Sequence, residues 1–311
     1  MAFKIAETLQ IDTIPGRTVL IDADVVAYYA SYPMDDLPLR SATRRADSRM
    51  EQIIEECQAE FYKGFLTGSD NFRDHVATLQ RYKGNRYDQD GKRITPQPHW
   101  LAEVREYLED KWGCELVHGK EADDALGIEQ IKYAKAGIES IISSIDKDLW
   151  IIPGLHHNMN SGLIDTVDEF GWIELVKGKV KGVGLKFFYA QMLMGDRTDW
   201  IMGLPKITED IKKRWPSVRR GGCGATAAFR ILEDAETELE CIERILFCYE
   251  SYWGVTSYIP WRTKKELPPG TDFIRLQIDE QGQLLWMQHY EGELWSLQAR
   301  INRYLPEDSR K

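Results

Sequence analysis

Short apolar runs alternate with amphipathic stretches over the first half of the chain. The runs predict strands, because they are rich in Ile, Val and Leu and end at polar turns; they lie at residues 18–21, 60–66, 116–117, 139–144 and 163–167. Helical spacing follows most of them, at residues 25–30, after Asp47 as an expected N-cap, from Pro98 to Gly113, and at 126–134. Strands that alternate with helices predict an α/β fold with a parallel sheet.

The second half of the chain has a different pattern. Residues 186–252 read as mostly helical, interrupted by a loop rich in glycine and basic residues at about 203–224. Residues 273–278 and 284–289 flank a polar turn, which predicts a β-hairpin. Four tryptophans in this region are expected to pack the hairpin against the helices: Trp253, Trp261, Trp286 and Trp295.

Composition limits the class of protein. The 311 residues carry a net charge of −10, which argues against a protein that coats nucleic acid or membrane non-specifically. Local basic patches on an acidic chain remain compatible with an enzyme that acts on nucleic acid. Five cysteines without a C-x-x-C pair predict reduced thiols and a cytoplasmic protein. No apolar run is long enough to predict a signal peptide or a membrane span.

Acidic residues gather where predicted elements end. The four clusters are Asp22/Asp24, Glu121/Asp123/Asp124, Asp146/Asp148 and Asp196/Asp199. Strand ends of one polarity meet at one edge of a parallel sheet, so the first three clusters are expected to converge. Carboxylate oxygens suit Mg²⁺ or Mn²⁺, and two such ions can activate water and neutralise a phosphodiester. Each pair taken alone has an alternative interpretation as a solvated turn.

A basic, aromatic stretch at residues 72–93 has little apolar periodicity and predicts a loop or mobile arch. Lys83 and Arg86 are candidates to hold a phosphate, and Tyr82 is a candidate to stack on an unpaired base. Lys92 and Arg93 read as ordinary solvated cations. His156 and His157 lack a third zinc ligand at useful spacing and are expected to be a loop pair.

Five motifs in order resemble the bacteriophage 5′→3′ exonucleases of the flap endonuclease superfamily. They span about residues 18–232 and are Ile21-Asp22-Ala23, Tyr82-Lys83-Gly84-Asn85-Arg86, Glu121-Ala122-Asp123-Asp124, Ser144-Ile145-Asp146-Lys147-Asp148 and Met194-Gly195-Asp196-Arg197-Thr198-Asp199. The resemblance implies a PIN-like nuclease domain at 1–185 with a helical arch at about 81–100. It also implies a helix–three-turn–helix region at 186–255, which leaves 256–311 as an extension of unassigned role.

The resemblance also implies residue roles. Asp22, Glu121, Asp123 and Asp124 match ligands of the catalytic metal, and Asp146, Asp148, Asp196 and Asp199 match the second metal group. Lys83 and Arg86 match the arch cations that contact the scissile phosphate, whereas Asp24 lies outside the core motif. The implied activity is metal-dependent 5′→3′ exonuclease and flap endonuclease cleavage with Mg²⁺, for which Mn²⁺ substitutes. The implied substrates are DNA with 5′ ends, flaps or nicks and RNA–DNA hybrids, cut by a monomer in the host cytoplasm during phage replication, recombination or primer removal.

Two departures from the family pattern stand out. Where the family has an aspartate after the second strand, this chain has Gly68, with Asp70 two residues on. The duplex-binding turn begins at Gly203 but is completed only at 221–227, after an insertion rich in lysine and arginine. Backbone amides of such a turn bind phosphate without reading sequence. The candidate DNA contacts here are Lys206, Arg219, Arg220, Gly222, Gly224 and Thr226, and the resemblance adds K⁺ at the turn.

Two other functions remain open from the sequence. Residues 19–25 imitate the nucleophile motif of haloacid-dehalogenase phosphatases, with Asp22 as nucleophile and Asp24 as acid/base. This alternative gives no role to the three acids at 121–124 or to Lys83 and Arg86. The second alternative is a structure-specific DNA-binding protein that does not cleave.

Overall fold

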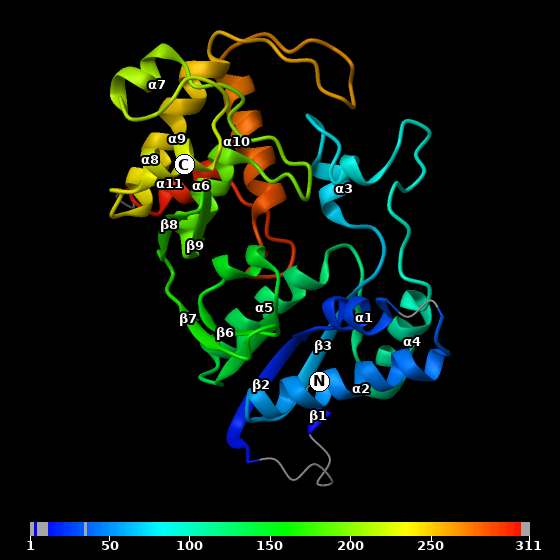
Figure 1. Cartoon of the computed structure of the whole chain (residues 1–311). Helices are drawn as coiled ribbons and strands as arrows, with labels where there is room; N and C mark the ends of the chain where they lie inside the picture. Colours follow the sequence, from blue (N-terminus) through cyan, green and yellow to red (C-terminus); the bar gives the residue numbers. More distant parts are fainter. Residues whose placement is uncertain (1–2, 5–11, 34–35, 306–311) are drawn as a thin grey trace. The chain divides into compact units, whose positions relative to one another are not determined.

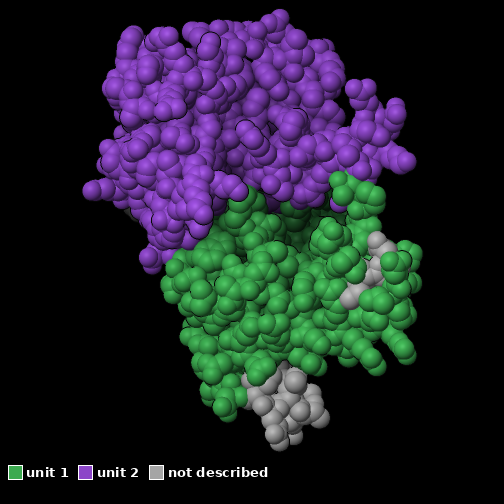
Figure 2. Space-filling view, in the orientation of Figure 1, with its two compact units in different colours: residues 1–72, 95–167, 287–293 green, residues 73–94, 168–286, 294–311 purple. Residues whose placement is uncertain are grey.

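The computed structural model describes residues 3–4, 12–33 and 36–305 (Figure 1). Residues 1–2, 5–11 and 34–35 of the predicted domain 1–185, and residues 306–311 of the predicted extension 256–311, lie outside the described residues. The chain divides into two compact units, each made of several segments (Figure 2). Unit 1 comprises residues 1–72, 95–167 and 287–293, and unit 2 comprises 73–94, 168–286 and 294–311. The division at 185 and 255 stays a prediction.

A mostly parallel sheet forms the centre of unit 1. Its strands are β1 (Phe3–Lys4), β2 (Ile14–Asp22), β3 (Ala59–Thr67), β4 (Glu115–Val117), β5 (Ser140–Ser144), β6 (Gly154–Asn158) and β7 (Ile164–Val167). The order runs β1-β3-β2-β5-β6-β7, and β4 also pairs with β3. Neighbouring strands among β2 to β6 are parallel, whereas β1 and β7 add antiparallel edges. The five predicted strands and the α/β fold class are confirmed.

Helices cover both faces of this sheet. The first group consists of α1 (Ala23–Ser31), α2 (Leu39–Glu56) and α4 (Leu101–Trp112), whose apolar faces share a core with Val19 and Ile21 of β2. Side chains alternate along a strand, so Leu20 points to the opposite face, and α5 (Ala122–Lys135) packs on β2, β3 and β5. Gly113 ends α4 in the left-handed conformation at φ 61°, as expected.

One N-cap prediction is wrong. Asp47 lies inside α2 rather than at its start, and its carboxylate accepts hydrogen bonds from Tyr107, Lys111 and Trp112 on α4. The helix begins eight residues earlier, after Pro38, without a side-chain cap. A polar side chain at a helix–helix contact imitated a helix start in the sequence.

Unit 2 is mainly helical. It contains the end of α3 (Phe72–Val76), η1 (Gly84–Arg86), the hairpin β8 (Trp172–Val176) and β9 (Lys179–Val183), and the helices α6 (Gly184–Met194), α7 (Glu209–Arg214), α8 (Ala225–Leu232), α9 (Glu238–Trp253), α10 (Thr271–Leu285) and α11 (Leu297–Asn302). Residues 184–193 of α6 are all buried, which fits an apolar helix at the centre of a bundle. It contacts α8, α9 and α10.

The C-terminal prediction is corrected by α10. Residues 273–278 and 284–285 belong to one helix, not to two strands of a hairpin. Its buried residues include Phe273, Gln277, Gln281 and Leu285, so polar glutamines interrupt the apolar stripe and conceal the helical period. Trp253, Trp286 and Trp295 are core residues, as expected, but they pack among helices. No described helix is long and apolar enough to cross a membrane.

Candidate metal centre and phosphate-binding cations

Asp22 stands at the end of β2, where the strand passes directly into α1. Its Oδ1 accepts the Val25 backbone N–H at 3.2 Å and caps the helix, while Oδ2 accepts the Ser144 hydroxyl of β5 at 2.7 Å. The carboxyl group is 3% exposed. Burial, with a smaller contribution from the nearby Asp146, raises the pKa of Asp22 to about 6 despite the hydrogen bonds from Ser144 and Val25.

Asp123 lies in the first turn of α5, among other carboxylates. Its pKa is well above the usual value, first because of burial and then because Asp22 and Asp146 add negative charge, followed by Glu121 and Asp124. The predicted convergence is therefore observed in unit 1: acids from three sequence clusters act on one another at the carboxyl ends of β2, β4 and β5.

The neighbouring Asp124 also has a role in the fold, and its place among the metal ligands stays a prediction. It is fully buried, its Oδ2 accepts the Glu121 N–H at 3.1 Å, and its Oδ1 accepts the Gln288 N–H at 3.1 Å. The first contact belongs to a capping box at the start of α5. One backbone N–H donates to each of its oxygens, so Asp124 stabilises the start of α5 and anchors the 287–293 segment within unit 1.

The other acids of unit 1 have identifiable partners. Glu121 accepts a hydrogen bond from Asn71 at 3.0 Å, and Asp146 caps η2 (Lys147–Ile151) through the Asp148 N–H at 2.9 Å. Asp148 pairs with the adjacent Lys147 at 2.8 Å. Asn71 and Ser144 were missed by sequence reasoning, although each adjoins a motif that was noted: Asn71 follows Asp70, and Ser144 begins the motif that contains Asp146.

The end of β3 has no room for the aspartate of the family pattern. A Cβ on Gly68 would lie 2.5 Å from the Val117 carbonyl oxygen. Asp70 is exposed, and its Oδ2 accepts the Ser69 hydroxyl at 3.3 Å. Asp24 has a structural role. It forms an ion pair with Arg105, and it accepts the Thr67 N–H at 2.9 Å.

The fourth acidic cluster lies in unit 2 with the candidate cations. Asp199 Oδ1 lies 2.9 Å from Arg86 Nη2 and 3.8 Å from Lys83 Nζ. Asp196 is 5% exposed and accepts the Thr198 N–H at 2.6 Å, which stabilises the turn that carries Asp199. The tertiary structure thus brings residues 83–86 and 196–199 together.

Tyr82 does not have the predicted accessible ring. It is 5% exposed, and its hydroxyl donates to Asp199 Oδ2 at 3.0 Å. The helical character expected for residues 81–100 is limited to η1 at Gly84–Arg86. Residues 81–94 of this segment are instead held by contacts within unit 2, among them the bond from the Lys83 N–H to the Asp199 carbonyl at 2.8 Å.

The candidate duplex-binding turn is exposed on unit 2. Gly224 is the N-cap residue of α8 without a side-chain cap, so backbone amides at this terminus have no side-chain acceptor there. The side chains of Lys206, Arg219 and Thr226 are exposed, as are Gly222 and Gly224. Arg220 is also exposed and pairs with Glu209 at 2.9 Å.

The two histidines are structural. They lie in β6 rather than in a loop, and both are buried. His156 hydrogen-bonds the Ile152 carbonyl at 2.7 Å and stacks on Trp150, and His157 contacts Ser143 at 2.8 Å and Glu56 at 2.9 Å.

Within the described residues, no three His, Cys, Asp or Glu side chains are spaced to hold a metal ion as they stand. The electrostatics of Asp22 and Asp123 nevertheless fit a cation. Burial and mutual repulsion oppose the ionised form of both carboxyls, and a divalent ion would relieve that opposition. The donors are carboxylate oxygens, which suits Mg²⁺ or Mn²⁺.

A comparison with solved structures finds one with this fold and others that align less well. The T5 5′-exonuclease with bound zinc aligns with a TM-score of 0.51 and 16% identity over 86% of each chain. The T5 D15 protein co-crystallised with metal ions gives 0.47 and 15% over 86% of each chain. The catalytic core of Rad2 in complex with DNA gives 0.35 and 12%, over 98% of this chain and 95% of that one. The first alignment shows a shared fold, and no family model or curated sequence matches the chain.

Proposed function

We propose that the chain is a metal-dependent 5′ nuclease that hydrolyses DNA phosphodiesters. The observation that carries the proposal is the convergence of Asp22, Asp123 and Asp146 in unit 1, which makes the pKa of Asp123 abnormally high. Carboxylates held this close repel one another, and hard divalent ions bound between them would offset that repulsion. The shared fold with the T5 5′-exonuclease agrees with this choice.

The proposed ligand set consists of Asp22, Asp123 and Asp146, with Glu121 and Asp148 beside them. Mg²⁺ bound there would supply activated water and neutralise charge on the phosphodiester. Ser144 and the Val25 N–H hold both oxygens of Asp22 in one orientation, and Asn71 donates to one oxygen of Glu121. These contacts orient the carboxylates before any ion binds, which lowers the cost of assembling the site.

The cations of unit 2 are proposed to bind the phosphate backbone. Asp199 holds Lys83 and Arg86 at one place, so it acts as a positioning residue for them. A role for Asp196 and Asp199 in a second metal site stays a prediction. Lys83 has the left-handed conformation at φ 50°, an uncommon state for a non-glycine residue that often marks a functional position.

The turn around Gly222 and Gly224 is proposed to contact duplex phosphates. Exposed amides at the start of α8 and the exposed Lys206, Arg219 and Arg220 offer positive charge without base-specific groups. Neutralising Lys206 and Arg219 together should weaken DNA binding. The slope of log K against log salt should fall by the amount that corresponds to the loss of about one to two phosphate contacts. K⁺ at this turn, hybrid substrates and the monomeric state stay predictions.

The two alternatives fit less well. A haloacid-dehalogenase mechanism needs Asp24 as a mobile acid/base, but its ion pair with Arg105 and its bond to the Thr67 N–H fix it in the fold. A binding protein without cleavage would retain the repulsion around Asp123 without using it.

One assay separates the three functions. The wild type and Asp123→Asn are incubated with Mg²⁺ and a 5′-flap duplex, a blunt duplex or a small phosphomonoester. The proposal expects the wild type to release short 5′ fragments from DNA, and Asp123→Asn to lose this activity while its DNA affinity is retained. Hydrolysis of the phosphomonoester alone would support the phosphatase. Tight DNA binding with no digestion in Mg²⁺ or Mn²⁺ would support the non-cleaving protein.

A further inference from the structure

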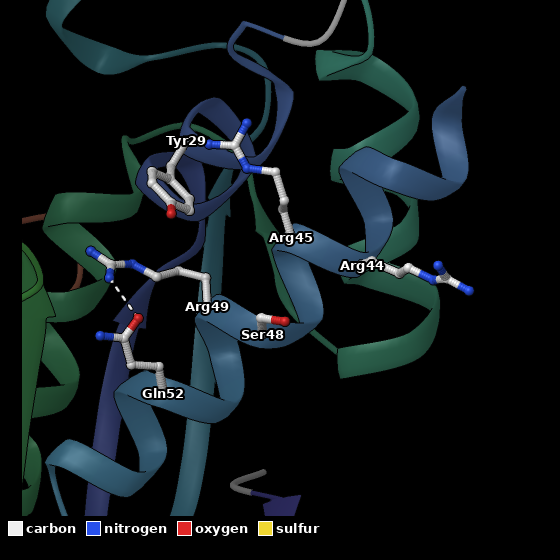
Figure 3. A pocket seen from close by; sticks show the side chains of 6 residues that line it. All are labelled: Tyr29, Arg44, Arg45, Ser48, Arg49 and Gln52. Carbon is white, nitrogen blue, oxygen red and sulfur yellow. Dashed lines mark hydrogen bonds between the residues drawn. The ribbon is translucent and has the colours of Figure 1, made fainter. Parts of the chain in front are cut away.

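A pocket in unit 1 lies apart from the acidic residues, between α1 and α2. Its volume is about 180 Å³, and it is lined by Tyr29, Arg44, Arg45, Ser48, Arg49 and Gln52 (Figure 3). Five of these residues come from α2, whose i, i+4 spacing places Arg45 and Arg49 on one face. None of the six is acidic, although the chain as a whole has a net charge of −10.

Two guanidinium groups of this pocket share one aromatic ring. Arg45 lies 4.7 Å and Arg49 5.0 Å from the centre of the Tyr29 ring. Figure 3 shows them reaching the ring from different sides, whereas Arg44 extends away from it. Cation–π contact orients both groups, but it does not neutralise their charges. Like charges near one ring repel one another, and an anion bound in the pocket would offset this repulsion.

Arg49 adds buried positive charge to the wall of the pocket. It is 8% exposed, its Nη1 donates to Gln52 at 3.0 Å, and its Nη2 donates to the Met159 carbonyl. Its buried Nε has no hydrogen-bond partner among the described residues. An unsatisfied N–H on a buried charged group is costly, and this donor adds positive potential next to a pocket that is already rich in arginine.

The surroundings indicate which anion. Tyr28 and Tyr32 stack on each other at 6.1 Å beside Tyr29 on α1, and they are 50% and 59% exposed. Exposed aromatic rings next to arginines are typical of surfaces that bind unpaired nucleic acid, where bases stack and phosphates meet cations. Tyr29 is seven residues from Asp22 along one helix, a rise of about 10 Å.

We propose that the Arg45–Arg49 pocket binds a backbone phosphate of an unpaired DNA strand. The inference rests on the proposed nuclease function, and it adds a second contact that selects DNA with a single-stranded segment. Arg45 and Arg49 supply the charge, Tyr29 holds both guanidiniums, and the Tyr28–Tyr32 pair faces the adjoining bases.

The test compares Arg45→Gln with Arg40→Gln. Arg40 is exposed on the same helix and does not line the pocket, so both variants lose one charge. Binding to a blunt duplex and to the same duplex with an oligothymidine tail is measured by fluorescence anisotropy in EDTA, which prevents cleavage. Arg45→Gln should weaken binding of the tailed duplex about fivefold and reduce the slope of log K against log salt by about 0.7, the value for one single-strand phosphate. For Arg40→Gln, the loss of affinity for the tailed duplex and the change in the salt slope should each be less than about a third of the change expected for Arg45→Gln.

Three results would overturn the proposal: equal weakening for the blunt duplex, equal weakening by Arg40→Gln, or no weakening by Arg45→Gln. If Arg45→Gln unfolds, Tyr28→Ala replaces it, because Tyr28 is 50% exposed and belongs to the pair that faces the bases, so its loss should weaken binding of the tailed duplex alone. The two proposals fail separately. A wild type that binds the tailed duplex through Arg45 but digests nothing contradicts the nuclease, and normal digestion with unchanged binding in the variants contradicts only the pocket.

Discussion

The Ser144 hydroxyl donates a 2.7 Å hydrogen bond to Asp22 Oδ2, which ties together the ends of the parallel neighbours β5 and β2. Both groups are buried, with 5% and 3% exposure. The contact orients a proposed metal ligand from a strand distant in sequence. A centre built at the carboxyl edge of a parallel sheet depends on such contacts, since each ligand arrives on a different element.

Ser144→Ala should lower the affinity for Mn²⁺ about tenfold, because Asp22 loses the bond that fixes one of its oxygens. Isothermal titration calorimetry measures the affinity. The matched control is Ser143→Ala on the same strand, whose hydroxyl contacts His157 instead. Equal losses in both variants would mean that the effect comes from the strand and not from Asp22.

Asp123→Asn should stabilise the metal-free protein by about 1 kcal/mol, because it removes a charge that four neighbouring carboxylates oppose. The free energy of unfolding is measured with urea in EDTA. Asp110→Asn, at an exposed position on α4, should leave it unchanged. A destabilised Asp123→Asn would contradict the repulsion on which the proposed metal centre depends.

Asp124→Ala should destabilise the protein by about 2–4 kcal/mol, since the Glu121 and Gln288 N–H groups lose their buried acceptor. Below the unfolding transition, its DNA cleavage should remain within about tenfold of the wild type. Urea unfolding and cleavage rates are measured on the same preparation. Unchanged stability with abolished cleavage would place Asp124 in the set of metal ligands.

Lys83→Ala should lower the turnover of DNA about a hundredfold and change DNA affinity by much less if Lys83 contacts the scissile phosphate, as the family resemblance implies, because such a cation acts mainly on charge that develops in the transition state. Single-turnover rates and anisotropy give the two quantities. Lys92→Ala, an exposed cation of the same segment, is the control. Equal losses of affinity and turnover for Lys83→Ala would assign Lys83 to simple binding.

His156 should make stability depend on pH. Burial lowers the pKa of His156 from 6.5 to about 4, despite the Ile152 carbonyl and Asp165, so the unfolded chain binds the extra proton between these values. The contribution of neutral His156 to the free energy of unfolding is therefore fully present above pH 6.5. It is lost as the pH falls toward 4, which lowers the free energy of unfolding by at most about 3 kcal/mol. His156→Gln should flatten this slope, and His75→Gln at an exposed site should not. Equal slopes in all three proteins would contradict the burial effect.

Local sequence was sufficient for the elements with regular periods. Apolar runs that end in acids predicted β2, β4 and β5, and the stripe from Leu101 to Trp112 with Gly113 predicted α4, because these signals depend on neighbours within one turn or one strand. The same reasoning failed for α10, where Gln277 and Gln281 face the core and interrupt the stripe. Burial of those glutamines is decided by other helices.

The acidic residues were visible in the sequence, but their roles were not. Asp123 and Asp124 are adjacent, yet one lies among carboxylates and the other accepts two backbone N–H groups, one of them from Gln288. Tyr82 is buried against Asp199, a residue 117 positions away. The order of residues determined where charge would accumulate along the chain, because strand ends and helix starts are local. Only the tertiary structure decided which charges meet and which find a partner, because that depends on segments far apart in the sequence.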